Sequence, residues 1–446
     1  MPRINRYFRR SPFDREIFAL AIPALGALAS DPLVTLIDTA FVGRLGSAPL
    51  GALGVNAAVF SFAFIIFNFL AYGTTPRVGR AVGRRDRAGA GRIVMQAIML
   101  ALIAGVVATT ILLIFSGPIL RAMGASGELF DQALIYLRIR AFAGPAVLLV
   151  TAGHGAFRGY HDTKTPLVVT LILNVVNLIL DPLFIFGFGW GIAGAAWATV
   201  VAQWTGALLF LGYLLVWKRE ELGIRIVIPM LRELLPFLKI GWELAIRTFA
   251  LIGTMTIATA VATRVGVTAV AAHQVAAQLW MFMALIVDAL AVSAQALVAG
   301  YIGKSQPRLA RAVSDRLLLF GLAVGLILAG AFALSSTFLP HIFSDDPAVI
   351  ALVVSVFPFI VVMQPLNALV FVWDGVFMGI EDFRYLARAM LASAAAGIAI
   401  LMMVVPAGWG LQGVWWGIIS LMIVRMLTLA WRYYRHGSRL FAVTSG

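Results

Sequence analysis

The segment GAFRGYHD at residues 155–162 is followed 220 residues later by the similar segment GVFMGIED at residues 375–382. The same interval matches Arg44 with Arg264, far from the first pair of segments. Weak internal similarity at one fixed interval is typical of membrane transporters built from two structural repeats. The chain is therefore predicted to consist of two homologous halves.

The composition of the chain is that of an integral membrane protein. Of its 446 residues 61% are hydrophobic and only 12% are charged, and the mean hydropathy is +0.96. Apolar windows of about 20 residues, the length that crosses a bilayer, recur throughout. They predict twelve transmembrane helices, at residues 16–43, 51–76, 93–119, 129–157, 165–188, 191–217, 234–263, 268–299, 309–339, 348–378, 385–406 and 410–431.

The distribution of the basic residues predicts the orientation of these helices. The formal net charge is +14, and most of the 34 Lys and Arg residues fall in the segments that are cytoplasmic if the N-terminus is cytoplasmic. This asymmetry follows the positive-inside rule, and the even number of helices agrees with it. We expect a multi-pass protein of the inner (plasma) membrane with both termini in the cytoplasm, and nucleic-acid binding is not needed to explain the charge.

The duplication predicts how the helices are grouped. Six helices per half is an even number, so both halves enter the membrane in the same orientation, related by a pseudo-two-fold axis along the membrane normal. The predicted fold is all-α, with two six-helix lobes at residues 1–217 and 234–446 and a cytoplasmic linker at 218–233. Such bundles usually work by rocking around a site in the middle of the membrane.

A polar stripe lies within one of the predicted spans. In NVVNLILDP, residues 174–182, the side chains of Asn174, Asn177 and Asp181 share one face of a helix. A charged residue at the centre of a membrane helix costs roughly 2.5–3.5 kcal/mol on insertion scales, and such residues face protein or water rather than lipid. The stripe therefore predicts a binding site.

Further polar groups complete the predicted site. Asp31 and Asp38 are seven residues apart on the first helix and share a face. Asp38, Asn177, Asp181 and Thr199 supply the carboxylate, amide and hydroxyl oxygens that a proton relay or a small cation such as Na⁺ requires. The alternative is that these groups only form hydrogen bonds between packed helices.

Other charged residues within the spans are predicted to form ion pairs. Glu243 and Arg247 have the i,i+4 spacing of a helical pair, and Arg425 is expected to neutralise Asp288 or Asp374. The second half lacks the polar set of the first, because Ala258 and Leu401 stand at the positions that match the two acids of the first half. The main ion chemistry is therefore predicted in the first half.

The sequence gives little support for an enzyme. It contains no cysteine, which excludes thiolate nucleophiles and Cys-ligated metals. The segment GYIGKS at 300–305 resembles the end of a phosphate-binding loop, but Val298 occupies the position of the required first glycine. We expect no catalytic residues and no cofactor other than the coupling ion.

Three segments resemble a known family. They are similar to signatures of the multidrug and toxic compound extrusion (MATE) transporters, closest to the prokaryotic DNA-damage-inducible-F-like branch, and the likeness covers essentially the whole chain. The segments are IPALGALASDPLVTLIDTAFVGRLG (22–46), FRGYHDTKTPLVVTLILNVVNLILDPLFIFG (157–187) and GIAGAAWATVVAQ (191–203).

The resemblance implies roles for individual residues. Asp38, Asn177, Asp181 and Thr199 match the polar site of the first lobe, which is loaded with a proton or Na⁺ in exchange for drug. Pro23 matches the proline at which the first helix bends. This implies that cation binding is linked to a change in the shape of the first helix.

The remaining candidates are assigned from the residues and the resemblance together. Asn174, His154, Pro23 and Asp31 are predicted to contribute to substrate binding or coupling. His154 departs from the family, which often has asparagine there, and a hydrogen-bonded packing role is the alternative for it. Asp374 resembles an aspartate of the sodium-coupled branch, so Asp374 and Glu243 are candidates for a second cation site.

The predicted function is secondary active multidrug export. Organic compounds, often cationic and amphipathic, would leave in exchange for H⁺ or Na⁺ by alternating access, because ion and drug compete for the same buried carboxylates. The runner-up is a flippase for lipid-linked saccharides or another lipid. An enzyme acting on lipids and a channel are disfavoured. We expect small-molecule substrates, a lipid bilayer, a monomer and no nucleic acid.

Overall fold

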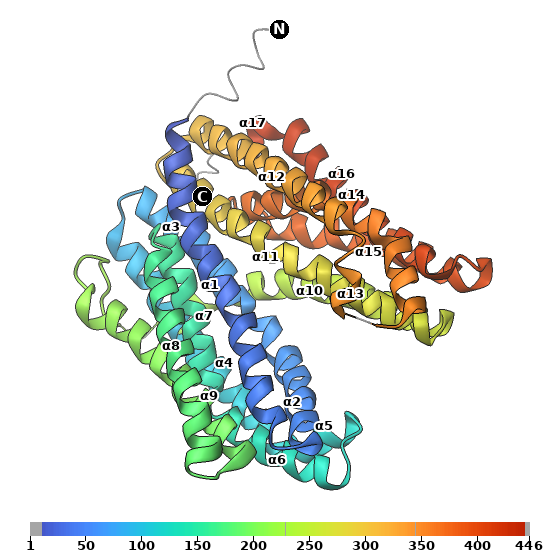
Figure 1. Cartoon of the computed structure of the whole chain (residues 1–446). Coiled ribbons are helices and arrows are strands. Elements are labelled where there is room, and N and C mark those ends of the chain that lie inside the picture. Colours follow the sequence, from blue (N-terminus) through green and yellow to red (C-terminus); the bar gives the residue numbers. More distant parts are fainter. Residues whose placement is uncertain (1–10, 228, 344, 442–446) are drawn as a thin grey trace. The chain divides into compact units, whose positions relative to one another are not determined.

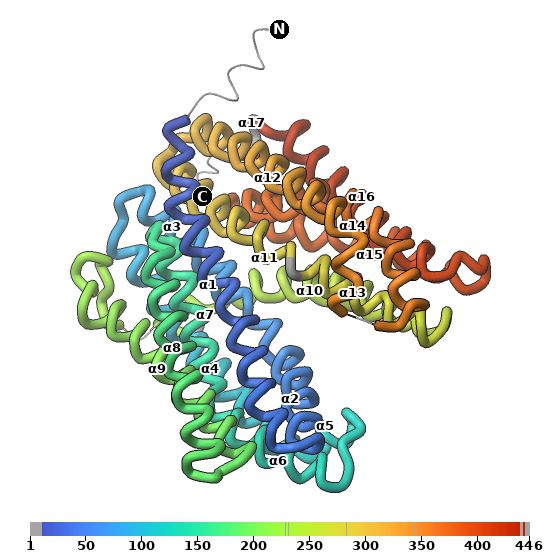
Figure 2. The backbone as a smooth tube through the Cα atoms, in the orientation of Figure 1, coloured from blue at the N-terminus to red at the C-terminus, as the bar shows by residue number. Residues whose placement is uncertain are grey.

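The computed structural model describes residues 11–227, 229–343 and 345–441, and over these residues all regular structure is helical. Figure 1 labels the helices and Figure 2 traces the same path along the chain. The elements are α1 (Pro12–Gly43), α2 (Ser47–Ile65), η2 (Ile66–Asn68), α3 (Phe69–Gly83), α4 (Arg87–Ile114), α5 (Ser116–Ala122), α6 (Gly127–Ala141), α7 (Gly144–Gly159), α8 (Lys164–Pro182), η3 (Leu183–Gly187), α9 (Gly191–Gly212), η4 (Tyr213–Trp217), α10 (Leu231–Val265), α11 (Val267–Gly303), α12 (Pro307–Ser335), α13 (Pro340–Phe343), α14 (Pro347–Gly379), α15 (Phe383–Ala407), α16 (Gly410–Arg435) and α17 (Gly437–Leu440).

The helices fit the predicted membrane spans. Within the described residues 11 helical segments are long and apolar enough to cross a bilayer, and there are up to 12 if α6 and α7 count as one span. These two helices meet at a bend of 51°. The bend falls inside the window 129–157, which its uniform hydropathy had marked as a single helix. The predicted all-α membrane fold is confirmed.

The duplication is visible in the backbone. Arg85 and Ser305, which are repeat partners, have φ angles of 60° and 56° directly after α3 and α11. His161 and Glu381, also repeat partners, have φ angles of 60° and 62° in the turns after α7 and α14. Left-handed backbone at a non-glycine residue is uncommon. Its recurrence at matched positions shows that the two halves end their helices in the same way.

Matched glycines also set equivalent helix contacts. A Cβ atom on Gly155 would lie 2.8 Å from the Cα atom of Ala71, and one on Gly375 would lie 2.3 Å from the backbone oxygen of Ala291. Small residues allow membrane helices to approach at backbone distance. The same pair of helices in each half, α3 with α7 and α11 with α14, therefore packs through a glycine at the same position.

The chain folds as two compact units that differ from the two halves of the sequence. The N unit is Ile22–Gly241, and the C unit combines the described residues up to Ala21 with those from Trp242 onward. Both boundaries fall inside a long helix, α1 and α10, at positions that match in the repeat. The first turns of each half's first helix thus belong to the other unit, which chain order alone does not indicate.

Specific contacts hold these exchanged helix ends. In the C unit the Asp14 carboxylate at the start of α1 accepts two hydrogen bonds from Arg316, of 2.7 and 2.8 Å. The hydroxyl of Tyr301 donates to Glu16 over 2.9 Å. In the N unit the start of α10 places the Phe237 ring 4.3 Å from the guanidinium of a neighbouring arginine. Each exchanged end is therefore an integrated part of its unit.

Candidate ion and substrate site

Two carboxyl groups from different helices meet in the N unit. Asp181 near the end of α8 is only 1% exposed, and its side chain is in hydrogen-bonding contact with that of Asp38 on α1. Within the described residues neither oxygen of Asp181 accepts a bond from any other donor. An ionised carboxylate can only accept, so a hydrogen bond between the two groups requires that one of them carries a proton. The structure thus places two carboxyl groups next to one another.

A tyrosine that sequence reasoning missed extends this pair. Tyr136 on α6 is buried, its hydroxyl is hydrogen-bonded to Thr199, and it lies within electrostatic range of both aspartates. Thr199 donates its own hydroxyl hydrogen to the backbone oxygen of Ala195 over 2.9 Å. Tyr136 therefore adds a buried hydroxyl close to Thr199 and to the two aspartates.

The amide of Asn177 lies one turn before Asp181 on the same face of α8, as the stripe predicted. Asn177 is 4% exposed, and in the described part of the chain its Nδ2 has no hydrogen-bond acceptor. A buried, unsatisfied amide donor is costly unless a ligand or water reaches it. All four residues of the predicted ion site lie in the N unit, and Asn177 shares a helix face with Asp181.

The second residue that sequence reasoning missed is Arg140. It is half-buried one turn after Tyr136 on α6, its guanidinium lies 5.3 Å from the centre of the Phe60 ring, and it interacts electrostatically with both Asp38 and Asp181. Residues Tyr136 and Arg140 are i,i+4 partners, a spacing that places both on one helix face. The i,i+4 spacing of Tyr136 and Arg140 is the signal in the sequence that could have identified both residues. Sequence reasoning used Arg140 only as one of the basic residues whose distribution predicts the orientation.

A cavity of about 320 Å³ lies in the same unit. Asp31 from α1 and His154 from α7 both line it, together with apolar residues such as Leu28 and Val150. The Asp31 carboxyl is in contact with the Asn174 side chain. Two of the predicted coupling residues therefore line the cavity, which combines acidic Asp31 and basic Arg158 with polar and apolar side chains.

The histidine in this cavity has a neighbour on α8. The Nε2 atom of His154 lies 3.3 Å from the hydroxyl of Thr170, and its ring centre lies 5.3 Å from that of Phe210. Both a packing role and a substrate role are compatible with these contacts.

Pro23 lies in an uninterrupted α1, at the boundary between the two units.

The C unit holds a different acidic centre. Asp374 on α14 accepts hydrogen bonds through Oδ2 from Arg247, over 2.5 Å, and from Arg425. The side chain of Asp374 is 4% exposed and that of Arg425 is 3% exposed. The predicted pairing of Arg425 with Asp374 is confirmed, whereas Arg247, expected to pair with Glu243 on its own helix, reaches across to Asp374.

These two guanidinium groups bear on the predicted second cation site. They already provide counter-charges to Asp374, so its carboxylate is less available to a further cation. A site at Asp374 and Glu243 stays a prediction that this arrangement does not favour.

Comparison with known proteins agrees with the duplication. The family model described as MatE matches twice, at residues 23–183 and 244–403. Protein DETOXIFICATION 44, chloroplastic, of Arabidopsis thaliana is 35% identical, over 94% of this chain and 81% of its own length. DNA damage-inducible protein F of Escherichia coli strain K12 is 26% identical, over 97% of this chain and 95% of its own.

A solved structure has the same fold. It is described as a crystal structure of MATE in the bent conformation, and it superposes with a TM-score of 0.89 over 96% of both chains at 22% sequence identity. At this identity the likeness concerns the fold alone. Each of the two family matches covers most of one half of the duplication.

Proposed function

The chain belongs to the MatE family of multi-pass membrane transporters, and on this premise we propose that it is a secondary active exporter that exchanges organic compounds for protons. The observation that carries the proposal is the carboxyl pair of Asp38 and Asp181. Two nearby buried carboxylates resist joint ionisation, so the pair can gain and lose one proton as a unit. The N unit therefore holds a group suited to coupling.

Charge balance supports H⁺ rather than Na⁺ as the coupling ion. With one shared proton the Asp38–Asp181 pair carries a single negative charge, and Arg140 supplies one positive charge. Replacing the proton by Na⁺ would keep this balance but would require several oxygen ligands around the ion. Thr199 donates its hydroxyl hydrogen to a backbone oxygen, and the Asn177 amide Nδ2 is a buried donor with no acceptor among the described residues. Donor groups suit a proton-exchanging carboxyl pair better than a metal cation.

The cavity beside Asp31 supports an organic cation as substrate. The Asp31 carboxylate attracts positive charge on one side of a cavity that Arg158 also lines, and its apolar residues remove hydrocarbon from water, as is usual in sites for small molecules. Asp31 and Asp38 lie on one face of α1, so a cation at the first residue and a proton at the second act on the same helix. Negative coupling between them is what antiport requires.

The conformational step is assigned to α1 and α8. Loss of the shared proton leaves two negative charges on Asp38 and Asp181, and their repulsion favours separation of the two helices. α1 begins in the C unit and Pro23 lies at the boundary, where a missing backbone hydrogen bond makes bending less costly. Protonation would bring the helices together again and reduce the space available to the drug.

The experiment is efflux of a fluorescent organic cation from proteoliposomes under proton and sodium gradients imposed separately. We expect the proton gradient alone to drive transport, and the Asp38→Asn protein to give none under either gradient. Transport driven only by sodium would contradict the assignment of the ion. Failure of both gradients, with translocation of a lipid-linked probe instead, would favour the flippase.

We further propose that both termini are cytoplasmic, which the basic loops support. Since the chain has no cysteine, single cysteines introduced by Ser126→Cys and Gln306→Cys report orientation directly. A membrane-impermeant thiol reagent applied to intact cells should label the first and not the second. The reverse pattern would invert the topology.

A further inference from the structure

A second cavity lies on the face of the N unit that carries the basic loops. Its volume is about 370 Å³, and no residue lines both it and the Asp31 cavity. It is formed by the first turns of α4 and by the segment that leads into α10. Its lining residues are Ala88, Arg92, Met95, Arg225, Val227, Pro229, Met230 and Glu233.

The segment that forms one wall is fixed at its beginning. A Cβ atom on Gly91 of α4 would lie 2.3 Å from the backbone oxygen of Gly223, so α4 and the segment touch at backbone distance. The hydroxyl of Tyr160 donates to the backbone oxygen of Leu222 over 2.8 Å. Burial raises the pKa of Tyr160, so this hydroxyl keeps the proton that it donates. The cavity wall is therefore a packed structure at this point.

Two arginines give the cavity its charge. Arg92 and Arg225 are exposed, and neither forms an ion pair with any described residue. Glu233 also lines the cavity, and its carboxylate accepts a hydrogen bond of 3.4 Å from Gln96. The balance of charge in the cavity is positive. Guanidinium groups bind phosphate oxygens with paired, charge-assisted hydrogen bonds.

The rim of the cavity is apolar and exposed. Val227 and Met230 line it and are 60% and 74% exposed, and Ile226, next to Val227 in the chain, is 57% exposed. They stand where α4 and α10, both membrane-spanning helices, begin. A soluble anion would gain nothing from these side chains, whereas a lipid uses the arginines for its headgroup and the apolar rim for its chains.

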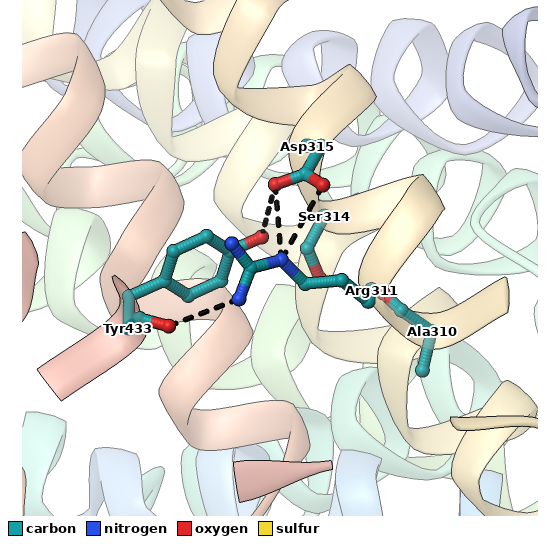
Figure 3. A network of polar contacts seen from close by, with 5 residues as sticks. All are labelled: Ala310, Arg311, Ser314, Asp315 and Tyr433. Atoms are coloured by element: carbon teal, nitrogen blue, oxygen red, sulfur yellow. Dashed lines mark hydrogen bonds and ion pairs between the residues drawn. The ribbon is translucent and has the colours of Figure 1, made fainter. Parts of the chain in front are cut away.

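The matched turn of α12 in the C unit pairs its arginine with other side chains of the protein. Position 315 in α12 is the repeat partner of Met95, and there Asp315 accepts a 3.2 Å bond from Arg311 and a 2.7 Å bond from the Tyr433 hydroxyl (Figure 3). The guanidinium of Arg311 also lies 3.8 Å from the Tyr433 ring centre. The C unit thus neutralises its arginine internally, while the N unit leaves two arginines in an open cavity.

We propose that this cavity binds the phosphate headgroup of an anionic phospholipid. Arg92 and Arg225 hold the phosphate, and the acyl chains lie over Ile226, Val227 and Met230 toward the bilayer. Basic pockets at the membrane surface favour anionic over zwitterionic lipids by about 1 kcal/mol per basic residue. The site is separate from the transport site and does not depend on the identity of the exported compound.

The test is native mass spectrometry of the purified full chain titrated with phosphatidylglycerol and, separately, with phosphatidylcholine. In the Arg92→Gln/Arg225→Gln protein, binding of phosphatidylglycerol should fall roughly tenfold or more, while the weak binding of phosphatidylcholine stays unchanged. The matched control is Arg308→Gln/Arg384→Gln, which removes two exposed arginines from the C unit. It should bind both lipids as the unmodified chain does.

Three results would overturn the proposal. Equal phosphatidylglycerol binding by the test variant would exclude the two arginines, and an equal loss in the control would indicate a diffuse charge effect. Displacement of the lipid by millimolar inorganic phosphate would assign the cavity to a soluble anion. Met230→Glu, which places an acid at the rim without touching either arginine, should also weaken phosphatidylglycerol binding, and its melting temperature checks that the chain is folded.

Discussion

The N unit and the C unit each bury an acidic centre in duplicated scaffolds, but the two centres are opposite in kind. In the N unit Asp38 and Asp181 interact with one another, and Arg140 is a nearby positive charge. In the C unit the single carboxylate of Asp374 is held by Arg247 and Arg425. The first arrangement can exchange a proton, and the second is a fixed ion cluster. Duplication supplied two equal frameworks, and the difference between the units lies in where carboxylates and guanidinium groups stand.

The sharpest way to break this comparison is to remove the acid of the C unit. Asp374→Leu leaves two buried arginines without their counter-charge, and removal of one partner from a buried ion pair costs about 3–5 kcal/mol of stability. We expect a large fall in melting temperature and in folded yield, measured by thermal denaturation in detergent. The triple variant Arg247→Met, Asp374→Leu, Arg425→Met removes the whole cluster and should recover much of the loss. A single variant as stable as the unmodified chain would show that the cluster is not a structural element.

The second prediction concerns the acid pair of the N unit. Asp38→Asn keeps the volume of the side chain and removes its titratable proton, so folding should persist while proton-driven export is lost. Proton-driven efflux and the melting temperature, measured on the same preparation, separate the two effects. Ordinary export by this variant would refute the assignment of Asp38 as a proton carrier.

Some features of the structure could be predicted from the sequence and others could not, for a physical reason. Membrane helices and their number follow from local hydropathy, and the stripe of Asn174, Asn177 and Asp181 follows from the helical period, so both were predictable. The contact between Asp181 and Asp38 joins α8 to α1 and was reached through the family resemblance. Local spacing in the sequence indicates which residues share a helix face, but it does not indicate which helices lie next to one another.

The misassigned arginines illustrate the same limit. Arg247 was expected to pair with Glu243 four residues earlier on its helix, but it donates to Asp374, 127 residues away. Arg140 lies at the end of α6, near a 51° bend that hydropathy did not reveal. Long side chains select partners by three-dimensional proximity, so an i,i+4 neighbour is only one of several competing partners.

A third experiment sharpens the comparison by changing the charge beside the acid pair. In Arg140→Gln the positive charge near Asp38 and Asp181 is lost, which disfavours their ionised forms. The pH profile of export should therefore differ from that of the unmodified chain. Arg138→Gln, an exposed arginine on the same helix, is the control. Equal profiles for both variants would remove Arg140 from the site.

The smallest effect is expected at a matched pair outside both centres. Arg44 and Arg264 are repeat partners, and both are exposed. Substitution of either by alanine should leave the pH profile of export unchanged and alter stability by no more than about 0.5 kcal/mol. A shift of the profile in only one of the two variants would show that the asymmetry of the units extends to their helix ends.

The exchanged ends of α1 and α10 bear on how such a chain could have arisen. A half-length ancestor with six helices would carry a first helix whose opening turns had no partner within its own fold. In the present chain Asp14 and Phe237 lie in these turns, and their partners belong to the unit built mainly from the other half. Two copies that traded these turns would complete each other, which is domain swapping in a homodimer. Fusion of the genes would then have joined chains that were already interlocked. Co-expression of residues 1–228 and 229–446 as separate polypeptides should accordingly yield one complex, with neither piece stable alone.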